Sequence, residues 1–199
     1  MKKFIQINIE NLRPTQFAVG MIEVAKKVNK IKNKNNKEID EYLKEHLIPV
    51  ILGPNNQYHL VDHHHLVRAC WEANLSKVPC IIRSDLSKEG LNFWKTMEKN
   101  HWVYLYDQFG NGPHSTEVLP HDITCLGDDP FRSLSWAVRD KGGYTKTTTF
   151  FSEFTWAEFF RKKLKVNNDP SSFEKSVISA LKLAKSKVAS HLPGWLGSK

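Results

Sequence analysis

The sequence predicts an α+β fold, in which a small mixed sheet with packed helices is followed by a helical C-terminal extension. Short strand-like segments alternate with segments of helical periodicity up to residue 118, and no internal repeat is visible. From residue 119 onward the pattern changes to helices joined by polar loops. We therefore expect a core domain at residues 1–118 and an extension at residues 119–199 that packs on the core.

The strand signals lie in the first half of the chain. Residues 3–9 alternate apolar and polar side chains, whereas residues 47–52 form an apolar run that ends at the turn formers Gly53-Pro54-Asn55-Asn56. Pro14 prevents regular continuation of the chain, so we expect a rigid corner there. The expected strands cover residues 3–9, 47–52, 57–61 and 78–83, with a further aromatic strand-like stretch at 102–106.

Helices are predicted where apolar side chains recur at spacings of three and four residues. The clearest case is the last one, which has Asp169 as its cap, Pro170 at the first helical position and an apolar stripe from Phe173 to Val188. One more helix is expected to begin after Asp62. The other expected helices cover residues 20–32, 38–46, 89–100, 131–140, 151–165 and 170–190.

The net charge of the 199-residue chain is +8, from 29 Lys and Arg against 21 Asp and Glu. A surplus of this kind attracts nucleic acid, nucleotides or acidic membranes. Residues 1–50 carry 10 basic and 6 acidic side chains and residues 151–199 carry 9 and 4, whereas the stretch between them is close to neutral. The basic flanks could therefore guide nucleic acid, but they do not identify a catalytic centre.

The sequence predicts a cytoplasmic protein with no membrane partner. Its apolar runs are far shorter than the ~20 residues that cross a bilayer, and its first residues are too short and polar for a signal peptide. Cys70, Cys80 and Cys125 are odd in number and lack Cys-x-x-Cys spacing, which argues against a disulfide framework or structural zinc.

The stretch richest in chemistry is a strand that ends at Asp62 and leads into a helix starting with His63-His64-His65. Backbone N–H groups and the helix dipole bind anions at a helix start, and histidines there add donors or a titrating acid or base. We therefore expect a phosphate site at this helix start. Asp62, His64 and His65 are the catalytic candidates, His63 adds a phosphate contact, and Arg68 would neutralise charge.

Helical spacing places His64 and Arg68 on one face with His65 beside them. The side chains expected to turn inward are Leu66, Val67, Cys70 and Trp71.

A structural interpretation of the same residues stays open. In it Asp62 is only an N-cap, Arg68 pairs with Glu72 four residues on, and the histidines are surface residues. A zinc site fits less well, because three consecutive helical histidines cannot converge on one ion and no Cys or acidic partner stands at a ligand spacing.

A second group of candidates lies in the extension. Asp128 and Asp129 precede Pro130 and could hold Mg²⁺, or they could be helix caps. Arg132 and Arg139 lie seven residues apart on one helix face, which would suit phosphate contacts. The aromatic side chains that follow are interleaved with glutamates at helical spacing, which favours a core over a base-stacking platform. They are Phe150, Phe151, Phe154, Trp156, Phe159 and Phe160.

These motifs, in this order, resemble the ParB/sulfiredoxin superfamily, and most closely its ParB-like putative nuclease family. The resemblance covers roughly residues 1–165. The matching motifs are Asp62-His63-His64-His65-Leu66 with Arg68-Ala69, Ser84-Asp85-Leu86-Ser87, Phe93-Trp94 with Met97, Asp128-Asp129-Pro130-Phe131-Arg132-Ser133-Leu134, Arg139 with Gly142-Gly143-Tyr144, and Phe154 with Trp156-Ala157.

The resemblance implies that a nucleotide phosphate is held at the start of the His63 helix. Members of the superfamily bind and hydrolyse CTP, activate ATP, use ADP in a free-serine kinase, or are assigned nuclease activity. It therefore implies a nucleoside triphosphate or diphosphate, with ATP or ADP first, and Mg²⁺ at Asp128 and Asp129. The Gly-Glu-Arg-Arg signature of partition proteins is absent, because His63-His64-His65-Leu66 stands at its place.

Three classes of function follow from the sequence. The first is a ParB-like nucleotide-binding enzyme that acts on phosphoester or phosphoanhydride bonds, as an NTPase or a nuclease. The second is an ADP- or ATP-dependent small-molecule kinase of the free-serine type. The third is a non-catalytic DNA-binding or partition-type regulatory module.

Overall fold

The computed structural model describes residues 3–166 and 169–197. The chain forms two compact units: the first comprises Met1–Val19 and Val24–Gly127, and the second comprises Gly20–Glu23 and Asp128–Lys199. The domain division that the sequence predicts at residue 118, and the packing of the extension on the core, stay predictions.

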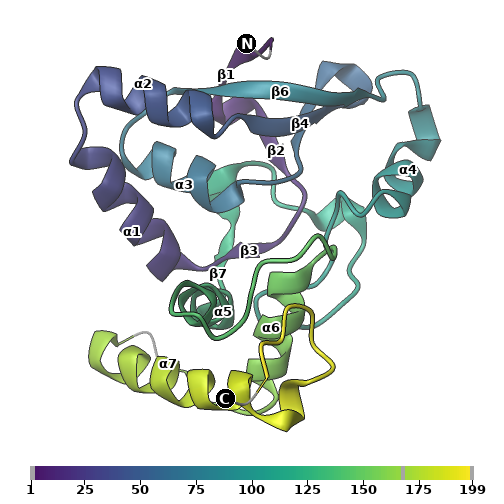
Figure 1. Ribbon diagram of the computed structural model, residues 1–199. Coiled ribbons are helices and arrows are strands. Elements are labelled where there is room, and N and C mark those ends of the chain that lie inside the picture. The colour runs from purple at the N-terminus through teal and green to yellow at the C-terminus, as the bar shows by residue number, and fades with distance from the viewer. Residues whose placement is uncertain (1–2, 167–168, 198–199) are drawn as a thin grey trace. The chain divides into compact units, whose positions relative to one another are not determined.

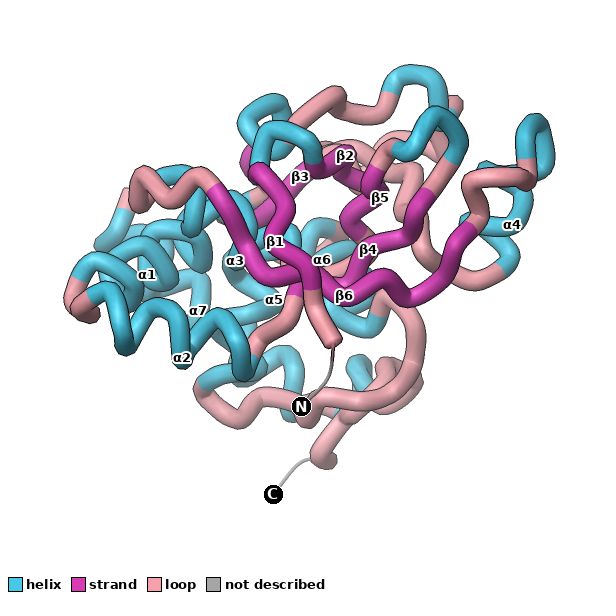
Figure 2. The backbone as a smooth tube through the Cα atoms, turned by 90° about the horizontal axis from the view of Figure 1, so that it is seen from above, coloured by secondary structure: helices cyan, strands magenta, loops and turns pink. Residues whose placement is uncertain are grey.

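The first unit is built on a curled, five-stranded mixed sheet (Figures 1 and 2). Its strands are β1 (Ile5–Asn8), β2 (Leu12–Pro14), β4 (Ile48–Leu52), β5 (Tyr58–Leu60) and β6 (Lys77–Asp85). They are ordered β1-β6-β4-β5-β2. β6 pairs antiparallel with β1 and parallel with β4, while β5 pairs antiparallel with β4 and parallel with β2. The mixed α+β architecture predicted from the sequence is confirmed.

The helices of this part of the chain follow the predicted periodicity. They are α1 (Met21–Lys32), α2 (Asn36–Glu45), α3 (His64–Glu72) and α4 (Phe93–Lys99). α2 starts with a capping box, in which Asn35 Oδ1 accepts from the Glu38 N–H at 3.0 Å and Glu38 Oε2 accepts from the Asn35 N–H at 2.8 Å. α4 lies beyond the C-terminal end of β6 (Figures 1 and 2). The predicted helix at 89–100 begins as a 3-10 turn at Gly90–Asn92.

The apolar run at residues 47–52 is the most deeply buried strand. Ile48, Val50 and Ile51 are fully buried in β4, between β6 and β5. Such a continuous apolar run is typical of a strand covered on both faces. Ile51 belongs to a core cluster with Phe93 and Met97 of α4, so the sheet and α4 are stabilised by the same buried surface.

One sequence expectation about this unit is wrong and another is only partly right. Pro14 is itself the last residue of β2, paired with Leu60 of β5, and the chain bends directly after it at residues 15–17. β2 is an edge strand with a neighbour on one side only, so the missing N–H of proline can face the side that has no partner strand. Residues 102–106 form no strand: Val103 is buried, and the Tyr104 N–H donates to the Thr15 carbonyl at 2.9 Å. The aromatic residues there predicted burial but not sheet pairing.

Two short strands, β3 (Ala18–Val19) and β7 (Gly127–Asp128), form a separate two-stranded sheet. Both flank a point where the chain passes between the units. No helix in the described part of the chain is long and apolar enough to cross a membrane. The described cysteines, Cys70, Cys80 and Cys125, are free thiols.

The second unit is helical, as predicted for the extension. Its helices are α5 (Pro130–Asp140), α6 (Ser152–Arg161) and α7 (Pro170–Lys185). The predicted α7 cap is confirmed, because Asp169 Oδ2 accepts from the Ser172 N–H at 3.0 Å. The predicted helix at 170–190 stops earlier, because Ser186 adopts an extended conformation before a 3-10 turn at Lys187–Ala189.

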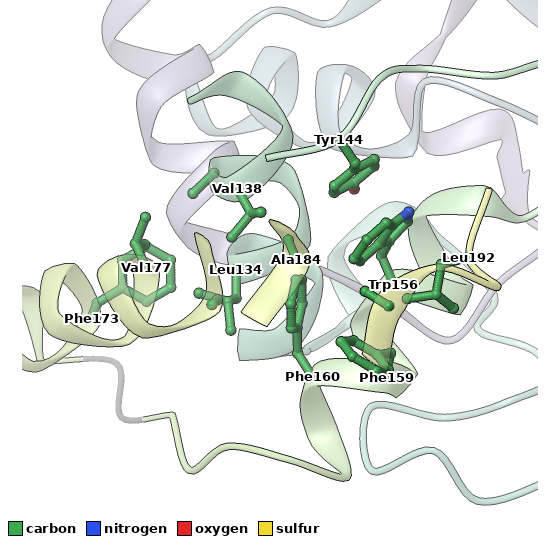
Figure 3. Packing of buried hydrophobic residues seen from close by; sticks show 13 residues of the cluster. Leu134, Val138, Tyr144, Trp156, Phe159, Phe160, Phe173, Val177, Ala184 and Leu192 are labelled. Atoms are coloured by element: carbon green, nitrogen blue, oxygen red, sulfur yellow. The ribbon is translucent and has the colours of Figure 1, made fainter. Parts of the chain in front are cut away.

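Aromatic side chains form the core of this unit (Figure 3). Trp156 is fully buried, stacks on Tyr144 with ring centroids 4.3 Å apart, and donates from Nε1 to the Pro193 carbonyl at 2.8 Å. Phe159 and Phe160 are buried beside it. The core interpretation of the aromatic cluster is confirmed for these residues, whereas Phe150 is 60% exposed.

His59 is a buried ionisable group in the first unit. Its side chain on β5 contacts Phe93 and Trp94, with ring centroids 4.6 and 5.3 Å away. A Cβ at Gly53 would lie 2.7 Å from His59 Cδ2, so only glycine leaves room for the imidazole there. Burial lowers the pKa of His59 to about 4, and the positive charge of Arg13 on the neighbouring β2 contributes in the same direction.

Acidification should therefore destabilise the first unit through His59. Between the ordinary pKa of 6.5 and about 4, the unfolded chain binds a proton at His59 that the folded chain does not bind. The free energy of unfolding should fall over this window, by up to about 3 kcal/mol. Urea unfolding from pH 7 to pH 4 should show a smaller fall for His59→Gln than for wild type. The exposed His121 provides the control His121→Gln, and equal slopes for all three proteins would contradict the prediction.

Truncation of the aromatic core should destabilise the second unit. Trp156→Ala removes a fully buried indole that stacks on Tyr144. It should therefore lower the free energy of chemical unfolding by about 3–5 kcal/mol. Phe150→Ala, at a 60% exposed aromatic, should change the free energy of unfolding by less than about 0.5 kcal/mol. An equal decrease in the free energy of unfolding of the two variants would contradict the prediction that burial determines the size of the loss.

Candidate functional site

The turn between β5 and α3 holds the predicted phosphate-site residues. His63 is the residue before the first helical position, and its backbone is left-handed, with φ 65° and ψ 22°. Asp62 Oδ1 accepts from the His63 N–H at 2.6 Å. The expectation that Asp62 is the N-cap is therefore wrong: His63 occupies that position, with no side-chain cap bond, and Asp62 stabilises the turn that precedes it.

His64, the first residue of α3, is buried and held by the edge of the sheet. Its side chain is 4% exposed, and its Nε2 accepts from the Thr15 N–H at 3.2 Å. Thr15 is itself anchored, since its Oγ1 donates to the Leu60 carbonyl of β5 at 2.6 Å. Because Nε2 is an acceptor, this contact fixes a neutral imidazole with its proton on Nδ1. The surface interpretation does not hold for His64.

His63 and His65 are partly exposed on either side of His64. Their side chains are thus accessible at the helix start. Leu66, Val67 and Cys70 turn inward as predicted, but Trp71 is 43% exposed, which corrects the expectation that it would be buried. The Arg68 guanidinium lies over the Trp71 ring, 5.3 Å from its centroid.

Arg68 is engaged in contacts within the protein. Its Nε and one terminal nitrogen contact Glu72 Oε1 at 3.0 and 2.9 Å, and its other terminal nitrogen donates to the Ile123 and Thr124 carbonyls at 3.1 and 3.0 Å. The predicted i+4 pairing with Glu72 is confirmed. These contacts connect α3 to the 3-10 turn at Ile123–Cys125 and favour a structural role for Arg68.

The carboxylates proposed for Mg²⁺ lie in the second unit and act as caps. Asp128 Oδ1 accepts from the Met21 N–H at 3.0 Å, at the start of α1. Asp129 Oδ1 accepts from the Phe131 N–H at 2.9 Å, and its Oδ2 pairs with Arg161 at 2.7 Å. Asp129 is 4% exposed, and burial raises its pKa against the opposing effect of Arg161. The predicted Asp129 N-cap is confirmed.

These carboxylates do not fit a metal site as they are arranged, because at least three of their four oxygens would have to leave their present partners to bind a metal ion. Both oxygens of Asp129 and one of Asp128 already accept hydrogen bonds or pair with Arg161. Within the described residues, no group of three or more His, Cys, Asp or Glu side chains is arranged to hold a metal ion. The Mg²⁺ site at Asp128 and Asp129 stays a prediction that these contacts do not favour.

Arg132 and Arg139 also have partners in the second unit. Arg132 is 6% exposed, and its guanidinium lies 3.5 Å from the centroid of the Phe154 ring. Arg139 forms an ion pair with Glu153 of α6. The sequence places both arginines on one helix face, but it does not reveal that one of them is buried.

Thr15 is the site residue that sequence reasoning missed. It is 2% exposed and contacts His64, Leu60 and Tyr104 through separate atoms. His64 lies 49 positions further along the chain, so no local pattern connects the two. The pairing of β2 with β5 brings them together. Prediction of a strand at Leu12–Pro14 that pairs with β5 would have indicated this contact.

Comparison with known proteins supports the predicted relationship. A family model described as "Putative ParB-like nuclease" matches residues 5–162. The crystal structure of protein Atu1540 from Agrobacterium tumefaciens is 38% identical, has a TM-score of 0.89, and is matched over 99% of this chain and 98% of that chain.

A second crystal structure is much less similar. It is the C-terminally truncated chromosome-partitioning protein ParB from Caulobacter crescentus complexed with CTP-γ-S, with 14% identity, a TM-score of 0.31 and 94% coverage of each chain. No curated protein matches the chain. The family match over residues 5–162 confirms the resemblance given by the sequence motifs, and this protein belongs to the ParB-like family described as "Putative ParB-like nuclease".

Proposed function

We propose that this protein binds the phosphate of a nucleotide or nucleic acid at the N-terminal turn of α3 and hydrolyses a phosphoester or phosphoanhydride bond there. The observation that carries the proposal is the first turn of α3, where a buried, neutral His64 is fixed by the Thr15 N–H between two partly exposed histidines. The family description as a ParB-like nuclease supports the same reaction class.

Phosphate binding at this turn follows from the helix geometry. α3 has nine residues, and its first backbone N–H groups carry the positive end of the helix dipole. The left-handed His63 followed by helical His64 is the type of backbone that turns successive N–H groups toward one anion. Asp62 stabilises this conformation through the His63 N–H. The ring of His63 would add a side-chain donor to the phosphate.

The three histidines would have different roles in hydrolysis. Nε2 of His64 is occupied by the Thr15 N–H, so His64 is assigned as a positioning residue that holds the turn. His65 is partly exposed and is assigned as the general base. It would accept a proton from the attacking water as the water oxygen bonds to phosphorus, and the P–O bond to the leaving oxygen would break. The leaving oxygen would then be protonated by solvent.

The basic flanks would serve a nucleic-acid substrate by attraction at a distance. They carry a net charge of +9, whereas residues 51–150, which include α3, sum to −1. If the flanks contact phosphates, DNA affinity should fall steeply with salt, while affinity for a mononucleotide should change less. This difference separates a nuclease from an enzyme whose substrate is a free nucleotide.

Substitution of His65 should reduce catalysis without unfolding the protein. His65→Ala should lower the rate of phosphate release or DNA cleavage by about 10²–10⁴-fold and should leave nucleotide binding largely intact. The assay is turnover of ATP, ADP, CTP, GTP and single-stranded DNA, with and without Mg²⁺. His65→Ala with wild-type turnover on the substrate that wild type hydrolyses would contradict its assignment.

The matched pair at position 64 tests the positioning role. His64→Ala removes the acceptor for the Thr15 N–H and should weaken nucleotide binding as well as lower the free energy of unfolding by about 1–3 kcal/mol. His64→Gln offers a carbonyl acceptor in place of Nε2, so it should recover part of both losses. If His64→Ala kept wild-type binding, the turn would not depend on this residue.

The capping assignment of Asp129 predicts a loss of stability that Mg²⁺ does not influence. Asp129→Asn removes the buried carboxylate charge that faces Arg161, which keeps its pairing with Glu158, so it should cost about 1–3 kcal/mol in thermal or chemical unfolding, with or without Mg²⁺. Asp140→Asn is the control, at an exposed carboxylate that ends the same helix. A normally stable Asp129→Asn protein with reduced Mg²⁺ affinity would favour the metal site.

A further inference from the structure

We infer that the segment Trp102–His114, called here the aromatic loop, is a surface on which a nucleobase stacks beside the phosphate-binding turn. The inference rests on the proposed function and narrows the ligand to one that carries a base, in preference to inorganic phosphates or sugar phosphates. The base could belong to a free nucleotide or to an unpaired nucleotide of nucleic acid, and the experiment below separates these two sources.

The aromatic loop is joined to the phosphate-binding turn through one residue. The Thr15 N–H donates to Nε2 of His64 at 3.2 Å, and the Thr15 carbonyl accepts from the Tyr104 N–H at 2.9 Å. All three residues belong to the first unit. The His64 ring at the start of α3 and the Tyr104 backbone of the aromatic loop therefore contact the same residue, Thr15. A ligand with its phosphate at the turn would have the loop next to it.

The loop presents aromatic rings to solvent. Tyr106 is 39% exposed and Phe109 is 68% exposed, so both rings can be reached from solvent. The Tyr104 and Tyr106 rings are 5.3 Å apart, because residues two apart on an extended segment point to the same side. Base stacking needs an accessible ring face and tolerates any base, since every base has a π-face.

Hydrogen bonds hold the loop in one conformation. Asp107 Oδ1 accepts from the Phe109 and Asn111 N–H groups, each at 2.9 Å, and its Oδ2 contacts His114 Nε2 at 3.1 Å. The His114 N–H donates to the Leu105 carbonyl at 2.8 Å, which closes the base of the loop. These bonds satisfy the Asp107 carboxylate internally. The exposed rings are therefore presented with little conformational freedom left to lose when a ligand binds.

Tyr106 is also fixed from inside the loop. A Cβ at Gly112 would lie 3.0 Å from Tyr106 Cδ1 and 2.6 Å from the Leu105 carbonyl, so the glycine allows the backbone to close on the ring. Gly112 also has a positive φ of 147°, which other residues rarely adopt. The contact supports the tyrosine while 39% of the residue stays accessible. This is the arrangement expected of a preformed stacking surface and not of a loop that shields the core.

The test compares ligands with and without a base on the full chain. Equilibrium binding is measured for ATP, CTP, tripolyphosphate and an oligo-dT strand. Wild type should bind the best nucleotide at least about tenfold more tightly than tripolyphosphate, since stacking adds to the affinity. Tyr106→Ala and Phe109→Ala should each remove about tenfold of the affinity for the base-bearing ligand and leave tripolyphosphate binding unchanged. Tyr106→Phe should retain the wild-type preference.

Phe150→Ala is the matched control, because Phe150 is an equally exposed aromatic of the second unit and should affect neither kind of ligand. Loss of affinity for oligo-dT with unchanged mononucleotide binding would assign the base to nucleic acid; loss for both would assign it to a nucleotide at the α3 site. Phe109→Ala keeps the inference testable if the Tyr106 variant misfolds, because most of the Phe109 side chain is exposed and its removal should not unfold the chain.

Two results would overturn the inference. If wild type bound tripolyphosphate as tightly as nucleotides, or if both alanine variants kept the wild-type preference, the aromatic loop would not be the base surface, while the phosphate site at α3 would stand. If wild type bound none of the four ligands, the proposed function and this inference would both fail. If the exposed rings instead bound only a protein partner, both alanine variants would keep the wild-type preference, which is the first of these results.

Discussion

The hydrogen bond from the Thr15 N–H to Nε2 of His64 is the constraint on which the site depends. It requires β2 to pair with β5, because Thr15 is fixed to the Leu60 carbonyl at the end of that pairing. It also requires His64 to be buried and neutral at the first position of α3. The left-handed turn at His63 follows, since the chain must leave β5 and deliver the next residue into the interior. The helix start is thereby held in a fixed position for an anion.

The contacts around this bond distinguish residues that could act on a ligand from residues that stabilise the structure of the site. His64 and Arg68 both point to phosphate chemistry in the sequence, but each is engaged within the protein, by Thr15 and by Glu72. His65 is partly exposed, and Tyr106 and Phe109 of the aromatic loop are exposed. A cluster of histidines at a helix start therefore contains both kinds of residue. Only the tertiary contacts distinguish them, because helical spacing places all of them on neighbouring faces.

Local patterns in the sequence predicted most elements of the fold and the location of the site, but not its long-range contacts. The apolar run at residues 47–52 correctly predicted β4, and Asp129 with Pro130 correctly predicted the start of α5. The pairing of Pro14 in β2 was missed because an edge strand tolerates proline, and the strand expected at residues 102–106 is absent because its backbone bonds to Thr15 instead of a sheet. Both errors concern partners that are distant in the chain.

A crystal structure with a non-hydrolysable nucleoside triphosphate bound would test the central claim most directly. We expect the phosphates to contact backbone N–H groups of the first turn of α3, which begins at His64, with the bonds from Thr15 to His64 and from His63 to Asp62 intact. Phosphates bound elsewhere in the chain, with this turn vacant, would contradict the account. So would a His64 ring that leaves Thr15 to coordinate the phosphate itself, because the residue would then be a ligand contact and not a support for the turn.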